Sequence, residues 1–378
     1  MYIYTSDRER ADVETGEFDD LGPVFESVEG HHSIFAAEVM CKPSERAMSR
    51  EDVLEALERQ VRFIASLYRP SGCEPLPNPS LRTFELRFIK GDDGGGAGNL
   101  RTAFVGKVFD EDGESSRRLA TELWQEVESL FPDDYALRPA SSEGEFEALF
   151  LGSLVEGIER SKQVAEIRRY EEFIPMEREE QVWEQNYLVY PFVWHGGARR
   201  QVFKVMLAFP GRHVLSVSLR PTKLYEAEER FLCDLYATAE KLSKVNWLRS
   251  KVQGQIGMQL YTTYLRRLKR PFLMRVQLTG EPAVPLPLAQ ALGAELTQPV
   301  GQGLNPAEEP FEVGYELVFP DPGVELGVAV RNLRLLEHDF WGPDLPLAKY
   351  RRFRYLVDAL WANCAFRLPI NERGFVNS

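Results

Sequence analysis

The sequence is poor in cysteine and has no long apolar run. Its four cysteines, Cys41, Cys73, Cys233 and Cys364, lie far apart and form no CxxC pair, which argues against a disulfide framework and favours reduced thiols. No stretch approaches the ~20 apolar residues that a membrane-spanning helix needs. The first twenty residues lack the basic and apolar regions of a signal peptide. We therefore expect a cytoplasmic protein without membrane contact.

Signatures of phosphate binding and catalysis are missing as well. The chain contains no GxxxxGK[ST] P-loop, no HExxH metal motif and no GxSxG nucleophile motif. The glycine-rich stretch 91–98 precedes a predicted strand, so it offers no helix N-terminus to a phosphate. Cys233 and Cys364 fall among apolar residues of predicted helices and are interpreted as inert core thiols. The sequence thus predicts no cofactor, no metal site and no catalytic residue.

Charge is distributed unevenly along the chain. The net charge is −13, but residues 1–180 hold 39 acidic against 21 basic residues, whereas the rest holds 19 against 24. The segment 241–275 contains nine lysines and arginines and no acid. Such a segment suits contact with a nucleic-acid backbone. The same cations also suit a solvated helix face, or a face that docks onto the acidic front half of this or another copy.

These cations, with a second basic group near residue 350, supply the candidate contacts. The candidates for contact with a protein partner or nucleic acid are Lys241, Lys244, Arg249, Lys251, Arg266, Arg267, Lys269, Arg270, Arg351 and Arg352. Arg351 and Arg352 lie at the start of the last predicted helix, where cations oppose the helix dipole and hint at a specific partner or packing.

Apolar periodicity predicts an α+β protein. A hydrophobic share of 44%, with 11% aromatics, is ample for packed cores. We expect two lobes of antiparallel sheet covered by helices and joined by long helical segments. The expected segments are a flexible acidic arm and first strand region (1–48), an N-terminal α+β lobe (49–180), a middle strand-strand-strand-helix unit (181–247) and a C-terminal α+β lobe with its linker helix (248–378).

Within these segments the patterns predict individual elements. Residues 5–30 are expected to be flexible or loosely docked. The predicted strands are 81–90, 100–109, 187–194, 200–209, 214–219, a strand from residue 272, 314–319 and 325–330. The predicted helices are one capped by Ser49 with Asp52, one opening at Ser115 or Ser116, and 143–169, 223–245, 248–269, 287–296 and 349–366.

Three segments resemble a known family. They are RTAFVGKVFDEDGESSRRLATELWQEVESLFPDDYALRPASSEGEFEALF from Arg101, VLSVSLRPTKLYEAEERFL from Val214, and the stretch from PFLMRVQLTG at Pro271 through RFRYLVDALWANCAFRLP. Together they resemble the N-terminal, non-motor region of bacterial HerA-like ATP-binding proteins, which are related to the ATPases of conjugation-type secretion systems. Trp361 stands where that family often has an acidic residue, which puts a conserved coupling role of this helix in doubt.

The resemblance implies an assembly role without catalysis. In the family this region supports assembly of a hexameric ring and engages partners, and the motor domain lies downstream. Here no motor sequence follows the junction, so we expect a non-catalytic assembly or adaptor subunit in mobile-element transfer or anti-phage defence. Its partners would be a separately encoded P-loop ATPase and other copies of itself. The alternatives are a nucleic-acid-binding adaptor that uses 241–275, and an enzyme whose site only the fold assembles.

Overall fold

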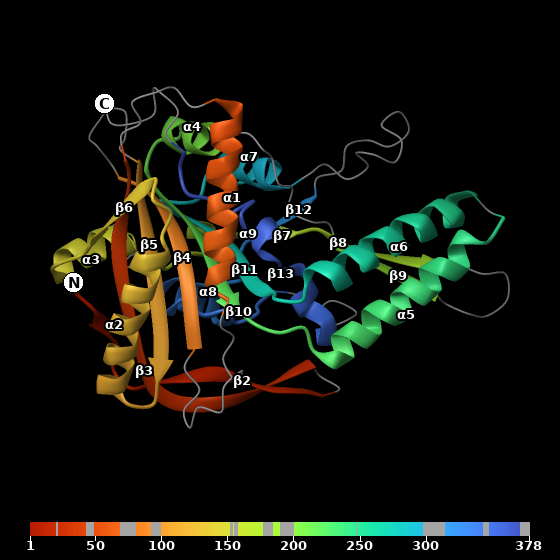
Figure 1. Cartoon of the computed structure of the whole chain (residues 1–378), viewed down its shortest axis with the longest axis horizontal. Helices are drawn as coiled ribbons and strands as arrows, with labels where there is room; N and C mark the ends of the chain where they lie inside the picture. Colours follow the sequence, from red (N-terminus) through yellow and green to blue (C-terminus); the bar gives the residue numbers. More distant parts are fainter. Residues whose placement is uncertain are drawn as a thin grey trace.

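An antiparallel sheet of eleven strands forms the centre of the described part of the chain (Figure 1). The computed structural model describes residues 1–19, 22–42, 49–68, 81–91, 100–151, 154, 158–176, 184–189, 200–246, 248–297, 314–342 and 348–370. The strands of the large sheet are β1 (Tyr4–Thr5), β2 (Glu9–Asp19), β3 (Gly22–Cys41), β4 (Leu81–Lys90), β5 (Leu100–Asp110), β6 (Tyr135–Pro139), β7 (Val164–Arg169), β10 (Arg212–Pro221), β11 (Phe272–Glu281), β12 (Tyr315–Val318) and β13 (Leu356–Val357).

Helices and a small second sheet complete the architecture. The α-helices are α1 (Arg50–Ser66), α2 (Gly113–Leu130), α3 (Glu143–Phe150), α4 (Arg200–Ala208), α5 (Glu226–Ser243), α6 (Leu248–Arg267), α7 (Leu286–Leu296), α8 (Val324–Leu335) and α9 (Ala359–Ala362). Short 3-10 segments are η2 (Ser161–Gln163) and η3 (Ala348–Arg354). Strands β8 (Glu171–Met176) and β9 (Glu184–Val189) pair only with each other. None of these helices combines the length and apolar character that crossing a bilayer requires.

The sheet joins strands from distant parts of the sequence. Its path is β1-β3-β5-β4-β10-β11-β7-β12, with β2, β6 and β13 attached beside it. Strand β10 pairs with β4 on one side and β11 on the other, so strands from all three expected α+β segments lie in one sheet. The α+β class and the antiparallel pairing are confirmed. The division at residues 48, 180 and 247 stays a prediction.

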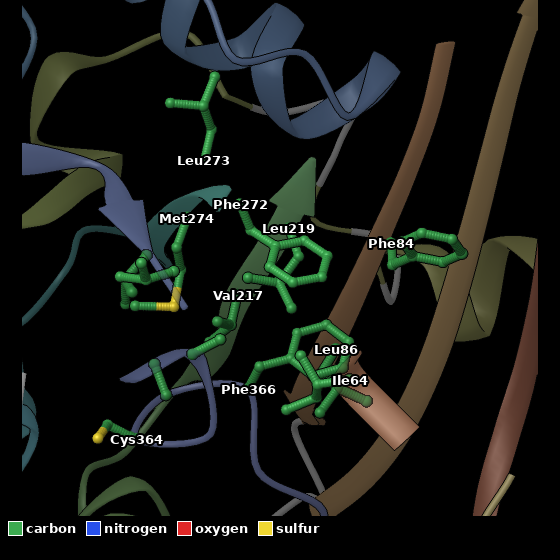
Figure 2. Packing of buried hydrophobic residues seen from close by; sticks show 14 of the residues in the cluster. Ile64, Phe84, Leu86, Val217, Leu219, Phe272, Leu273, Met274, Cys364 and Phe366 are labelled. Carbon is green, nitrogen blue, oxygen red and sulfur yellow. The ribbon is translucent and has the colours of Figure 1, made fainter. Parts of the chain in front are cut away.

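One face of the sheet is apolar. Figure 2 shows Ile64 of α1 close to Leu86 of β4, with Val217 and Leu219 of β10 and Phe366 beside them. Helices α1, α2, α7 and α9 contribute buried residues to this same cluster. Because strand side chains alternate between faces, the cluster takes every second residue of β4 and of β10.

The opposite face has apolar packing at two corners covered by helices, and also where β2 packs over Phe109 of β5. Helix α3 packs Phe146 and Leu149 near Ile34 of β3. Helix α8 packs Ala329 and Leu333 near Val164 of β7. Between the two corners the sheet presents polar side chains, which are described below.

Several predicted elements are confirmed at residue level. The helix predicted after Ser49 is α1, with the reciprocal capping box of Ser49 and Asp52 in place: the Asp52 amide donates to Ser49 Oγ at 3.2 Å, and the Ser49 amide donates to Asp52 Oδ2 at 2.7 Å. Strands β4, β5, β10, β11 and β12 and helices α5, α6 and α7 also lie where the patterns place them. The glycine-rich stretch 91–98 lies almost entirely outside the described residues.

Two predicted strands are helices. The predicted strand 200–209 is helix α4 from residue 200 to 208, because Phe203 and Met206 pack at helical spacing, with the Phe203 ring centroid 5.3 Å from that of Phe88. Residues 325–330 lie in α8, because Ala329 and Leu333, four residues apart, form one buried face. In both segments a dense apolar run favours a strand by local propensity, and tertiary packing overrides it.

Two predicted long helices are broken. The segment 143–169 forms α3 and, further on, η2 and β7. The segment 349–366 forms η3, β13 and α9, because Arg169 binds the backbone carbonyls that a helix would use. Its Nε donates to the carbonyl of Arg354 at 2.7 Å and its Nη2 to that of Leu356 at 2.8 Å.

Three smaller expectations are also wrong. The described residues between 5 and 30 lie mostly in β1, β2 and the first half of β3, because Ala11 and Val13 pack against Phe109 and give this acidic hairpin a small core. The cap of α2 is Asp112, whose Oδ2 accepts from the Ser115 amide at 2.7 Å. Cys233 is exposed on α5, whereas Cys364 is buried as expected.

Candidate functional site: a helical arm and a buried ionic face

Helices α5 and α6 form an antiparallel pair that projects away from the large sheet, at the right of Figure 1. We call this pair, residues 226–267, the arm. The end of the arm nearest the sheet, which we call its root, is fixed by aromatic side chains. Tyr261 Oη donates to the carbonyl of Tyr187 in β9 at 2.7 Å, and the rings of Phe231 and Tyr350 stack at 3.9 Å between centroids. The arm is therefore held by packing at its root while its outer surface stays available.

The two arm helices approach closely at Gly254. A Cβ atom at this position would lie 2.5 Å from the carbonyl oxygen of Ala239 and 2.5 Å from the amide nitrogen of Ser243. Both are backbone atoms of α5 or its last turn, which cannot move aside cheaply. Gly254 thus sets the spacing of the arm.

Most predicted contact residues are exposed on the arm or just after it. Six are exposed: Lys241, Lys244, Lys251, Arg266, Lys269 and Arg270. Lys244 forms an ion pair with Glu240 at 2.8 Å. Arg267 pairs with Asp358 at 3.0 Å, and its guanidinium lies 5.3 Å from the ring centre of Trp361. Arg249 belongs to the first turn of α6.

The basic residues near residue 350, Arg351 and Arg352, do not lie on one common surface. Arg351 is exposed, with its guanidinium 4.7 Å from the ring centre of Phe340. Arg352, predicted as a partner or nucleic-acid contact, is wholly buried. Its Nη1 donates to Glu14 at 2.7 Å, and its Nε lies 3.3 Å from Glu228. Arg352 is therefore a core residue that ties β2 and the root of the arm to η3.

The polar face of the sheet was not anticipated from the sequence. It consists of alternate residues on five strands, and we call it the ionic face: Thr83, Glu85, Arg87, Lys107, Glu166, Arg168, Ser216, Ser218, Arg220, Arg275 and Gln277. Register places these residues side by side. Ser218 pairs with Glu85 on one side and Arg275 on the other. All are at most 5% exposed.

Carboxylates join most of the buried cations. Glu166 accepts from Arg275 Nη1 at 2.6 Å and from Arg168 Nε at 2.9 Å. Glu85 accepts from Arg87 Nε at 2.7 Å. Burial alone would raise the pKa of Glu166, but Arg168 and Arg275 hold it below its ordinary value.

One backbone segment covers this face. Residues 336–342, the covering segment, follow α8 and cross the ionic face. Glu337 accepts from Lys107 Nζ at 2.7 Å, and the carbonyl of Trp341 accepts from Arg168 Nη2 at 2.9 Å. Gly342 has φ +94°, and a Cβ there would lie 2.8 Å from Arg168 Nη1. The covering segment is thus held both by these polar contacts and by the apolar packing of Leu336 and Trp341.

Two buried histidines lie against these cations. Burial, followed by the charges of Arg220, Arg275 and Lys107, holds the pKa of His338 well below its ordinary value. Burial and then Lys107 lower the pKa of His32 to about 2. Both imidazoles are therefore neutral at physiological pH.

The mutual pairing of most of these charges favours a structural role over catalysis. In the ranges described, no three histidine, cysteine, aspartate or glutamate side chains are grouped so that they could hold a metal ion. The strand pattern offered one signal for the ionic face, since polar residues alternate with Phe84, Leu86 and Phe88 in β4. That pattern identifies a shared face but not its burial.

Comparison with protein-family models and with curated proteins found no match to this chain.

Proposed function

We propose that this protein is a non-catalytic assembly or adaptor subunit of a HerA-like ATPase system. It presents the arm to a separately encoded P-loop ATPase, in mobile-element transfer or anti-phage defence. The proposal starts from the family resemblance and from the position of the resembling segments in the fold.

The main support for this proposal is that two segments with the family resemblance, far apart in sequence, meet at the root of the arm. The segment 214–232 forms β10 and the first turns of α5, and the segment 352–369 packs against them. Phe231 and Phe353 lie 5.9 Å apart between ring centroids, and Arg352 reaches Glu228. Several side chains fix the base of the arm, and this supports a role for the arm in docking.

The surface of the arm supports the same role. Lys241 and Lys251 are exposed near its tip, and Leu248, between them in sequence, is 72% exposed. An exposed apolar side chain among cations is typical of a protein-binding surface.

The test compares arm and control variants in a complex. The tagged full chain is co-expressed with the P-loop ATPase encoded nearest to its gene, and the ratio of the two purified proteins is measured. We expect the double variant Lys241→Glu/Lys251→Glu to lower the recovery of the ATPase at least about tenfold, because it reverses two charges at the proposed contact surface. Arg118→Glu, exposed on α2 outside the arm, serves as the control. Equal recovery with both variants, or ATP turnover by the pure chain, would refute the proposal.

A second candidate is a nucleic-acid-binding adaptor. Three exposed cations, Arg266, Lys269 and Arg270, lie together at the end of α6, in a segment that contains no acid. Fluorescence anisotropy with a duplex and a single strand, at about 50 and about 200 mM salt, tests this function. Binding that weakens steeply with salt and disappears when all three become Glu supports it. Binding unchanged in that variant rules out this surface.

A further inference from the structure

Arg220 is a buried cation with unusual surroundings. It is 5% exposed, and its side chain forms no hydrogen bond or ion pair with the described residues. Glu14 attracts it electrostatically. However, the two oxygens of Glu14 accept hydrogen bonds from Arg352 at 2.7 Å and from Thr222 at 3.0 Å. A largely buried charge without a direct partner is costly to desolvate.

Register places a short side chain between Arg220 and a second cation. Leu219 pairs with Phe84, so the next residues along the two strands, Arg220 and Thr83, are neighbours on the ionic face. Thr83 pairs in turn with Lys107. Neighbouring strands lie about 4.8 Å apart, so two long cationic side chains flank the small Thr83.

Polar atoms without partners lie on the ionic face and in its covering segment. Thr83 Oγ1, Arg275 Nε and His338 Nε2 are buried and have no hydrogen-bond partner among the described residues. Arg275 is diagonal to Arg220 across the β10–β11 pair, within reach of a long side chain. His338 lies in the field of Arg220, Arg275 and Lys107.

Charge in this region is unbalanced. Among the described residues, the ionic face and its covering segment bury five cations, Arg87, Lys107, Arg168, Arg220 and Arg275, against three carboxylates, Glu85, Glu166 and Glu337. Asp339, at the rim, is bound by Arg331. Glu14, which attracts Arg220 from outside this set, offsets part of the excess, and the positive charge that remains favours an anionic ligand.

We propose that the ionic face binds a small inorganic oxyanion of the phosphate class over Thr83, between Lys107, Arg220 and Arg275 and beneath His338. The Arg220 fork and the Lys107 ammonium supply charge-assisted hydrogen bonds. The Thr83 hydroxyl and the Arg275 Nε–H supply further donors. The burial of every one of these groups selects a free ion over a phosphoryl group carried on a larger ligand.

Such an ion would link the strands of the sheet to the covering segment. Lys107, Thr83, Arg220 and Arg275 come from four adjacent strands, and His338 comes from the covering segment. Binding to the folded state alone stabilises that state in proportion to the logarithm of ligand concentration. The site therefore predicts a saturable stabilisation of the full chain by phosphate.

The first test uses thermal unfolding of the full chain. Protein refolded from denaturant in phosphate-free buffer is titrated with sodium phosphate at pH 7.5, with sodium chloride adjusted to hold ionic strength constant. We expect a saturable rise in the unfolding temperature for the wild type and for Arg266→Gln, which removes an exposed cation. We expect at least about tenfold weaker phosphate binding for Arg220→Gln, as loss of charge-assisted bonds predicts. Equal responses of wild type and Arg220→Gln, or none in the wild type, would overturn the proposal.

A milder variant and a direct assay guard against misfolding of Arg220→Gln. Thr83→Val keeps the side-chain shape and removes one donor, and it should weaken phosphate binding while folding as the wild type does. Natively purified protein, dialysed without phosphate and then denatured, should release close to one phosphate per chain in a molybdate assay. Release from the wild type and the Thr83→Val variant in equal amounts, with identical titrations, would count against the site.

Discussion

Removing the carboxylate of Glu166 should destabilise the fold more than removing any surface carboxylate. Glu166 is fully buried and accepts hydrogen bonds from both Arg168 and Arg275, at 2.9 and 2.6 Å. The variant Glu166→Gln keeps the shape but leaves two buried guanidinium groups facing a neutral amide. Breaking a buried ion pair by removing one partner costs ~3–5 kcal/mol, so we expect the free energy of unfolding to fall by that amount.

The matched control lies on the next strand. Glu316 of β12 pairs in register with Arg168, but its side chain is 46% exposed and lies 3.3 Å from Arg354 Nη1. Arg354 is buried but keeps Glu171 as a second carboxylate partner, and ion pairs at the solvent surface contribute about 0–1 kcal/mol. Glu316→Gln should therefore be nearly neutral. Urea unfolding followed by tryptophan fluorescence and by circular dichroism measures both variants. A Glu166→Gln variant within about 1 kcal/mol of the wild type, or indistinguishable from Glu316→Gln, would refute the role assigned to the ionic face.

Three further predictions concern the arm, the buried histidines and a helix cap. Gly254→Ala should lower stability by about 1–3 kcal/mol, because its Cβ would overlap the α5 backbone, whereas Gly327→Ala on α8, with open space around it, should be neutral or stabilising in calorimetry. His32 and His338 stay neutral when folded but take up protons below about pH 6.5 when unfolded, so the free energy of unfolding should fall by about 1.4 kcal/mol per histidine from pH 7.5 to 5.5; equal urea midpoints at the two pH values would contradict this. Ser49→Ala should cost about 1 kcal/mol by removing the cap of α1, and an unchanged unfolding temperature would show that the cap contributes nothing.

The sequence predicts elements well where their signals are local. The capping box of Ser49 and Asp52 located α1, and alternation located β4. Burial of the polar side of β4 was not predictable, because the segment that covers it, residues 336–342, lies some 250 residues further along the chain. Alternation states which residues share a face, and only tertiary structure decides whether that face meets water.

The candidate contacts show the same limit. A cluster of cations without neighbouring acids correctly located exposed residues such as Lys251 and Arg266. The same criterion failed at Arg352, whose carboxylate partners Glu14 and Glu228 come from other parts of the chain. Local charge density cannot separate a surface cation from a core cation whose partner is distant in sequence.

The role of the arm is tested most directly by cross-linking mass spectrometry on complexes purified from native cells with the tagged full chain. The account predicts a stoichiometric partner that carries a GxxxxGK[ST] motif, cross-linked to Lys241, Lys244 or Lys251, with these links lost when Lys241 and Lys251 are changed to Glu and kept in Arg118→Glu. A P-loop partner cross-linked only to surfaces outside residues 226–267, or no P-loop protein in the complex, would contradict it.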